Sequence, residues 1–141
     1  MAYIADLSNY CYFATGPRLR AIGWLESNQP YEIAPTGKQE IACLREHLKE
    51  PFGIVDFMGT HACTLCSSRA PNETGELIIP SDSVCYVAPK MIAHYVEVHR
   101  YRPPAEFLAT LLRCPPQNSA EYMARIAPFL EELRSSIPRG A

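Results

Sequence analysis

The sequence has no long apolar run, no large excess of charge of one sign and no internal repeat. Its 141 residues include 13 Lys and Arg against 15 Asp and Glu, a net charge of -2, so no global positive field favours nucleic acid as a partner. No stretch approaches the roughly 18 apolar residues that a membrane span needs. The start, MAYIADLSNY, also lacks the basic and apolar regions of a signal peptide. We therefore expect a cytoplasmic protein that does not enter a membrane.

Several signatures of enzymes are also missing. There is no G-x-S-x-G, no P-loop and no dinucleotide-binding fingerprint, which removes the best-defined nucleophile and phosphate sites. The H-E-x-x-H of metalloproteases is absent, as is the H-x-E with a proline before C-x-x-C of zinc deaminases. Catalysis stays an open question on this basis, and a non-catalytic role is favoured.

The composition indicates one ordinary globular domain. Hydrophobic residues make up 48% and charged residues 20% of the chain, close to the average of folded proteins. Six cysteines are present, and in a reducing compartment they are not expected to form disulfides. Two belong to a motif described below, and the other four are interpreted as small buried apolar side chains: Cys11, Cys43, Cys85 and Cys114.

Hydrophobic periodicity and proline positions predict a small set of short elements. We expect a strand over 19–26, a helix over 36–50, a hairpin of 76–79 with 84–87, and helices over 88–99, 105–113 and from 119 onward. This order belongs to the α+β class, with a small antiparallel sheet or hairpin packed against helices. The predicted organisation is a zinc-binding domain over 1–114, followed by a helical extension over 115–141 packed on it.

Local signals predict where these elements begin and bend. Thr36 and Gln39 have the spacing of a capping box for the first helix. Pro89 can occupy the first position of the helix that follows the hairpin. Gly23, inside the first strand, indicates a bulge or the close approach of another backbone. Pro128 should kink or divide the last helix.

The HACTLC stretch, residues 61–66, predicts a metal site. A C-x-x-C pair lets one tight turn present two thiolates, Cys63 and Cys66, to one ion, and zinc takes four tetrahedral ligands from cysteine and histidine. The helix after the hairpin offers His94 and His99. Residues five apart on a regular helix differ by about 140° in direction, so His99 can serve only if the helix ends or tightens there. His61 is the alternative fourth ligand.

Two other interpretations of this motif compete with a structural Zn²⁺ site. The C-x-x-C could be a redox pair, although the βαβ setting of thioredoxin-like sites is missing. A zinc-dependent hydrolase would need an open coordination position and a carboxylate base, for which Glu97 and Asp56 are candidates. Four or five available ligands favour a closed structural site. His47 has no such neighbours and is interpreted as structural.

Five stretches together resemble a functionally uncharacterised bacterial domain family: IADLSNY, IGWLE, HACTLC, VCYVAPKMIAHYVEVH and YRPPAEFL. The family pattern has a Y-x-x-D-L-S start, a G-W-L segment, an H-x-C-x-x-C knuckle and an A-P-x-x-I-x-H-Y-V-x-x-H-x-Y-R-P-P block. The resemblance covers about residues 3–112. The sequence departs from it at Val87, where a small residue is usual, and at Lys90, where alanine is usual. All five candidate metal ligands fall on matching positions.

The resemblance implies a metal-binding intracellular domain without an assigned activity. Together with the motif, it leads us to expect a bacterial zinc-binding protein that acts as a non-catalytic interaction module of the accessory, regulatory or immunity type. Its expected partner is another protein. The sequence leaves open the identity of that partner and the oligomeric state.

Overall fold

The computed structural model describes residues 3–10, 16–53, 61–66, 72–73 and 75–134. The strands are β1 (Leu19–Ala21), β2 (His61–Ala62), β3 (Asn72–Glu73), β4 (Glu76–Pro80) and β5 (Cys85–Pro89). The helices are α1 (Lys38–His47), α2 (Ile92–Val98), α3 (Ala105–Arg113), α4 (Ala120–Ile126), the 3-10 turn η1 (Ala127–Phe129) and α5 (Leu130–Arg134). The fold is α+β, as expected. Within these ranges, no helix has the length and apolar character to cross a membrane.

The main sheet has three strands in the order β1-β5-β4. β4 and β5 form the expected hairpin, antiparallel with Ile78 opposite Val87. β1 lies on the other side of β5 and runs parallel to it, with Leu19 beside Cys85, so the sheet is mixed and not purely antiparallel. A parallel pair needs a long crossover connection, and here the chain between β1 and β5 contains α1 and the metal-site segment.

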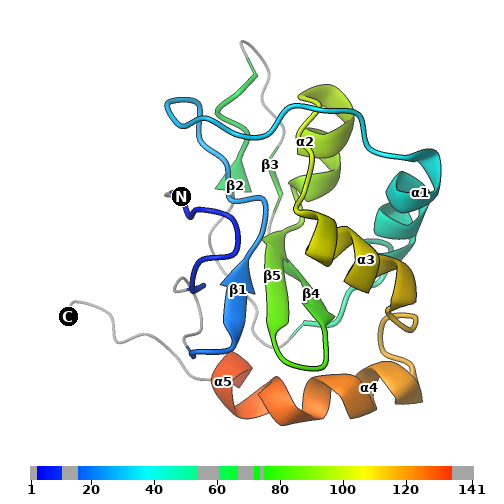
Figure 1. Ribbon diagram of the computed structural model, residues 1–141. Coiled ribbons are helices and arrows are strands. Elements are labelled where there is room, and N and C mark those ends of the chain that lie inside the picture. Colours follow the sequence, from blue (N-terminus) through cyan, green and yellow to red (C-terminus); the bar gives the residue numbers. More distant parts are fainter. Residues whose placement is uncertain (1–2, 11–15, 54–60, 67–71, 74, 135–141) are drawn as a thin grey trace.

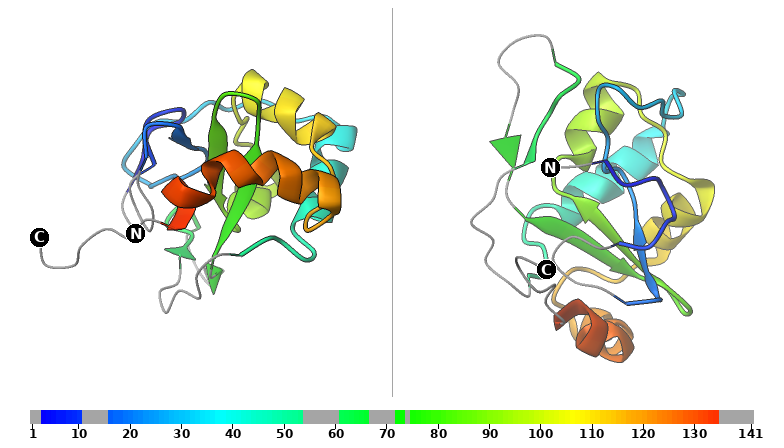
Figure 2. Two further views of the ribbon diagram at one scale, coloured as in Figure 1. Left: turned by 90° about the horizontal axis from the view of Figure 1, so that it is seen from below. Right: turned by 90° about the vertical axis from the view of Figure 1, so that its left-hand side faces the viewer.

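The main sheet lies between two groups of helices, so the fold has three layers (Figures 1 and 2). Side chains of the sheet alternate between two apolar clusters. Leu77, Ile79 and Tyr86 face a cluster with residues of α1, α2 and α3. Ile78 and Val87, one position along each strand, face a second cluster with residues of α4, η1 and α5. Because neighbouring strand residues point to opposite faces, the two five-residue strands of this hairpin are buried on both sides.

α1 starts two residues later than the sequence suggests. Its N-cap is Gly37, whose N–H donates to Oε1 of Glu40 at 3.0 Å. The predicted pairing of Thr36 with Gln39 is wrong: within the described part of the chain, the buried hydroxyl of Thr36 finds no hydrogen-bond partner. A glutamate three residues after the N-cap accepts a hydrogen bond from the free N–H of the N-cap residue. Its negative charge also interacts favourably with the positive end of the helix dipole.

Pro89 was expected at the start of a helix, and this prediction is wrong. Pro89 is the last residue of β5 and lies opposite Glu76, while α2 begins only at Ile92. Proline has no N–H to donate to a sheet, so the bond across this end of the hairpin comes from its neighbour. The next residue, Lys90, donates its N–H to the Gly75 carbonyl and closes the hairpin end.

Gly23 follows β1 where the chain passes close to α2. Its φ of +76° lies in the left-handed region, and a Cβ there would lie 3.3 Å from the side chain of Ile92. Its N–H donates to Asp6, which also accepts a hydrogen bond from the Tyr101 hydroxyl at 2.7 Å. The close neighbours of this glycine are therefore the side chains of Ile92 and Tyr101, and not another backbone as the sequence suggested.

The last helices pack across the second face of the sheet. Pro128 lies in η1, which separates α4 from α5, so the expected division of this segment is confirmed. Glu132 accepts hydrogen bonds from the backbone N–H and the guanidinium Nε of Arg18, and that guanidinium lies 4.7 Å from the centre of the Phe129 ring. These contacts join the extension to the start of β1. The proposed boundary at residue 114 stays a prediction.

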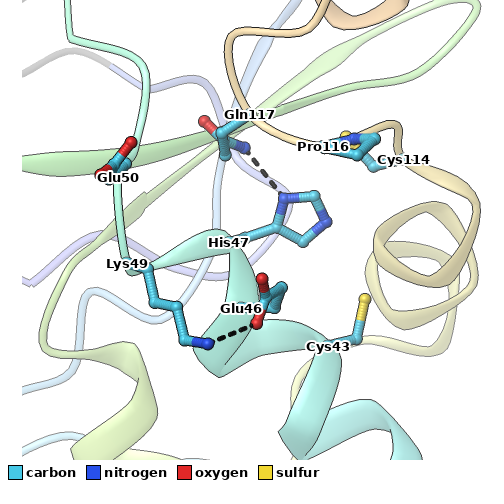
Figure 3. A pocket seen from close by; sticks show the side chains of 8 residues that line it. All are labelled: Cys43, Glu46, His47, Lys49, Glu50, Cys114, Pro116 and Gln117. Carbon is cyan, nitrogen blue, oxygen red and sulfur yellow. Dashed lines mark hydrogen bonds and ion pairs between the residues drawn. The ribbon is translucent and has the colours of Figure 1, made fainter.

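A cavity of about 520 Å³ lies beside the C-terminal end of α1 (Figure 3). Buried His47 forms part of its wall, together with Cys43, Cys114 and Gln117. His47 is 5% exposed, in keeping with the structural role expected from the sequence. Cys85 is fully buried and Cys43 and Cys114 are half-buried, while Cys11 lies outside the described residues.

Candidate metal centre

The cysteine pair lies in a short turn that follows β2. β2 pairs in antiparallel fashion with β3, with Ala62 opposite Asn72. Cys63 is 2% exposed and Cys66 is half-buried. Between them, the Thr64 hydroxyl accepts a hydrogen bond from the Ser27 N–H at 3.0 Å, which fixes the turn against the segment after β1.

The two histidines come from α2 and its C-terminal cap. His94 lies within the helix and His99 is its C-cap, with φ and ψ of -105° and 6°. The next residue, Arg100, has a φ of +56°. The helix thus ends at Val98. His99 follows it and turns its ring toward the face of the helix that carries His94. The sequence analysis required the helix to end or tighten at His99 for this residue to face the same ion as His94. The end of α2 at Val98 confirms that condition.

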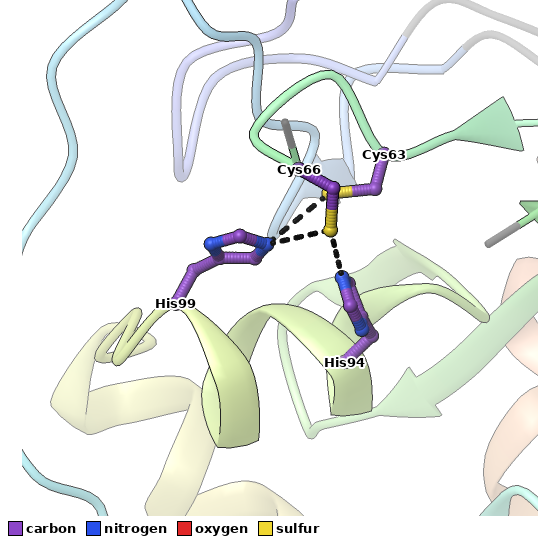
Figure 4. A group of neighbouring side chains, drawn as sticks. All are labelled: Cys63, Cys66, His94 and His99. Atoms are coloured by element: carbon purple, nitrogen blue, oxygen red, sulfur yellow. Dashed lines mark hydrogen bonds between the residues drawn. The ribbon is translucent and has the colours of Figure 1, made fainter. Parts of the chain in front are cut away.

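The four side chains converge on one point (Figure 4). One sulfur or nitrogen from each of Cys63, Cys66, His94 and His99 lies within 4.8 Å of all the others. Nε2 of His99 is 3.3 Å from both sulfurs, and Nε2 of His94 is 3.3 Å from the Cys66 sulfur. With Zn–S of about 2.3 Å and Zn–N of about 2.0 Å, tetrahedral sulfur and nitrogen ligands lie about 3.5 Å apart. The donor set therefore fits a tetrahedral ion.

The electrostatic surroundings also suit a cation. Burial lowers the pKa of His94, with a further contribution from His99, and this favours the neutral imidazole that a metal requires. Desolvation, followed by the neighbouring Cys63 thiol, raises the pKa of Cys66. A divalent ion between the two sulfurs would reverse that effect and stabilise both thiolates.

His99 is positioned by contacts that the local sequence does not reveal. The hydroxyl of Tyr31 donates to the His99 carbonyl at 3.1 Å, and the Ala34 N–H donates to the Arg100 carbonyl at 3.1 Å. Ile33 also forms an antiparallel bridge with Tyr101. Because these partners lie more than 60 residues away in the chain, no periodic pattern or motif could have identified them.

Two of the sequence-based candidates for catalysis or ligation lie beyond what the structure describes, and a third is engaged elsewhere. The side chain of His61 and the whole of Asp56 are outside the described residues. Glu97, the other proposed base, has its Oε1 2.6 Å from Nε of Arg45, which joins α2 to α1. The Glu97 carboxylate is therefore engaged in an ion pair with α1.

Replacing Arg100 by glycine should stabilise the protein. Arg100 is exposed and its φ is +56°, a conformation that costs an L-residue about 1 kcal/mol but costs glycine little. We expect the free energy of unfolding in urea to rise by up to about 1 kcal/mol. Arg125→Gly, at an exposed position inside α4, is the control and should lower it by a similar amount. A loss of stability in both variants would contradict this role for Arg100.

All four residues of the candidate metal site lie inside one family match. No curated protein and no solved structure matches the chain. A family model described as a domain of unknown function, DUF7919, matches residues 2–112. The match spans all four converging side chains and ends just before the last residue of α3. The chain therefore belongs to the DUF7919 family of uncharacterised domains.

Proposed function

We propose that this protein is a zinc-binding, non-catalytic module in which Cys63, Cys66, His94 and His99 hold one structural Zn²⁺. The observation that carries the proposal is the convergence of two sulfurs and two ring nitrogens within 4.8 Å. Zinc is the favoured ion because a set of two thiolates and two imidazoles in tetrahedral geometry matches its preference. Mg²⁺ and Ca²⁺ prefer oxygen ligands.

A structural role is supported by the number of protein ligands. Four side chains fill a tetrahedral coordination sphere, whereas a catalytic zinc has three protein ligands and an open position for water. The engagement of Glu97 by Arg45 also weakens the case for a hydrolase, which remains the alternative.

The proposed partner is another protein. Ile33 and Val98 are 62% and 58% exposed. Val98 directly precedes His99, and Ile33 is bridged to Tyr101 just beyond it. The metal would hold the end of α2 and the knuckle in one arrangement, and would so fix the surface on which these apolar side chains lie.

Elemental analysis of protein purified without a metal-affinity column tests the ligand set. We expect one zinc per chain in the wild type and in His61→Ala, and loss of zinc in Cys63→Ser, His94→Ala and His99→Ala. Here His61→Ala is the matched control, because it removes a histidine two residues from Cys63. Wild-type protein without metal would refute the proposal, and retention of zinc by His99→Ala would refute this choice of fourth ligand.

Substitution of Co²⁺ for zinc separates a closed site from a catalytic one. Four protein ligands predict a tetrahedral cobalt spectrum that added azide leaves unchanged, because no coordination position is free. An open hydrolase site would bind azide and its visible bands would shift. A reversible disulfide of Cys63 and Cys66 that forms in the purified protein with release of the metal would instead support the redox alternative.

A further inference from the structure

The side chain of Gln117 connects three parts of the fold that are distant in the sequence. Its Oε1 accepts a hydrogen bond from the Phe52 N–H at 2.8 Å, and its Nε2 lies 3.1 Å from Nδ1 of His47 and 3.5 Å from the Ile78 carbonyl. Figure 3 shows the His47 ring facing this amide across the cavity wall. Gln117 thereby joins the end of α1, the segment after it and β4.

These contacts allow only one protonation state of His47. An N–H can only donate, so the Phe52 amide requires the oxygen of Gln117 on its side and leaves the NH₂ group toward His47. An NH₂ group is a donor, and Nδ1 must therefore accept. The other ring nitrogen carries the proton and donates to the backbone of Leu111. The imidazole is neutral, with its proton on Nε2.

We propose that His47 and Gln117 form an acid-sensitive latch, which holds the end of α1 against the turn before α4 while the imidazole is neutral and weakens when Nδ1 takes up a proton. Protonation would bring an N–H of His47 against the NH₂ of Gln117. Rotating the Gln117 amide would relieve this contact, but it would then place NH₂ against the Phe52 N–H and an oxygen against the Ile78 carbonyl. No rotamer of the amide satisfies all three partners.

The acidic groups around His47 do not fully offset the cost of such a proton. Cys43 and Glu46 come from α1, Lys49 and Glu50 follow it, and Cys114 lies on the connection from α3. The Glu46 carboxylate is paired with Lys49 at 2.8 Å and exposed. Burial lowers the pKa of His47 from 6.5, opposed by its bond to Leu111 and by Glu46. The unfolded chain therefore binds this proton more readily, so the stability that the latch contributes is lost as the pH falls below about 6.5.

The latch has a position from which it can act on the metal-site segment. Glu50 and Phe52 precede the excursion, the part of the chain that contains β2, the cysteine pair and β3. The side chain of Asn118 donates a hydrogen bond to the Glu50 carbonyl at 3.0 Å. Gln117 and Asn118 both follow residue 112, where the family match ends. Acid would therefore loosen the start of this excursion from the C-terminal extension.

NMR on the purified full chain tests the proposal directly. A long-range ¹H–¹⁵N spectrum at pH 7.5 should show His47 as the Nε2–H tautomer. Hydrogen exchange of the Phe52 amide, corrected for its intrinsic rate, should show a protection factor that falls several-fold between pH 7.5 and 5.5. An Nδ1–H tautomer at pH 7.5, or equal protection at the two pH values, would overturn the proposal without any variant being needed.

Gln117→Glu distinguishes the latch from a general effect of acid. A carboxylate can accept from both the Phe52 N–H and a protonated Nδ1, so the pKa of His47 should rise by about one pH unit and the acid-induced loss of Phe52 protection should disappear. Gln39→Glu adds the same charge at an exposed position of α1 and should behave like the wild type. An identical loss of protection in wild type and Gln117→Glu would show that His47 is not its cause.

Discussion

Removal of the metal should lower the melting temperature by about 10 °C and leave the protein folded at 25 °C. An ion present at about a thousand times its dissociation constant stabilises the folded state by about 4 kcal/mol, and for a chain of this size each kcal/mol shifts the melting temperature by about 2–4 °C. The fold should survive because one apolar cluster covers each face of the main sheet. We expect these clusters to stay buried when the ion is removed.

Thermal melts with zinc and with excess EDTA, followed by circular dichroism, measure this shift. The single tryptophan, Trp24, is 1% exposed in the second cluster, so its fluorescence at 25 °C should stay that of a buried indole in EDTA. Cys63→Ser should melt at the EDTA temperature under both conditions. Cys43→Ser, a half-buried cysteine outside the site, should keep the full response to EDTA. Complete unfolding by EDTA at 25 °C would contradict this prediction, because it would show that the apolar clusters cannot keep the protein folded without the metal.

Raising the pH from about 5 to 8.5 should destabilise the protein through Glu76. This residue begins β4, is half-buried and accepts a hydrogen bond from the Tyr10 hydroxyl. Burial raises its pKa from 4.5 to about 8. The folded protein thus keeps a proton that the unfolded chain releases above pH 4.5. The corresponding stability is complete below that pH and is lost as the pH rises toward 8, by a few kcal/mol at about 1.4 kcal/mol per pH unit.

Glu76→Gln removes this dependence, because the amide oxygen can still accept from Tyr10 and no charge develops in the site. Urea unfolding at pH 6, 7 and 8.5, with zinc present throughout, should show a variant that is more stable than the wild type at pH 8.5, with the difference shrinking at pH 6. Glu121→Gln, at an exposed position of α4, should follow the wild type. If all three proteins lose stability in parallel between pH 6 and 8.5, Glu76 does not carry the effect.

Local patterns predicted the elements whose signals are contained within a few residues. The hairpin of β4 and β5, helix α3 over Ala105–Arg113 and the division of the last helix at Pro128 are all found. The errors occurred where two neighbouring residues offered similar local chemistry. Gly37 with Glu40 has the same spacing as Thr36 with Gln39, so the sequence offered two equivalent caps. Pro89 fits either a strand end or a first helical turn, and its pairing with Glu76 across the hairpin decides between these.

The candidate site shows the same division. The two-residue spacing between Cys63 and Cys66 is sufficient to predict a shared turn, and α2 could be nominated as the source of the other donors. Whether His99 could lie beside the two cysteines depended on where α2 ends. That end is set by the left-handed Arg100 and by Tyr31, whose hydroxyl holds the His99 carbonyl, and neither contact leaves a signal at the histidines themselves.

By itself, the sequence determined the α+β class, the main elements and the types of side chain that a metal would bind, because these follow from short-range periodicity and from the chemistry of individual residues. Only the tertiary structure decided the parallel pairing of β1 with β5, the convergence of the cysteine turn with the end of α2, and the contact of His47 with Gln117. Each of these joins segments separated by tens of residues. Their geometry depends on how the whole core packs, which no local pattern encodes.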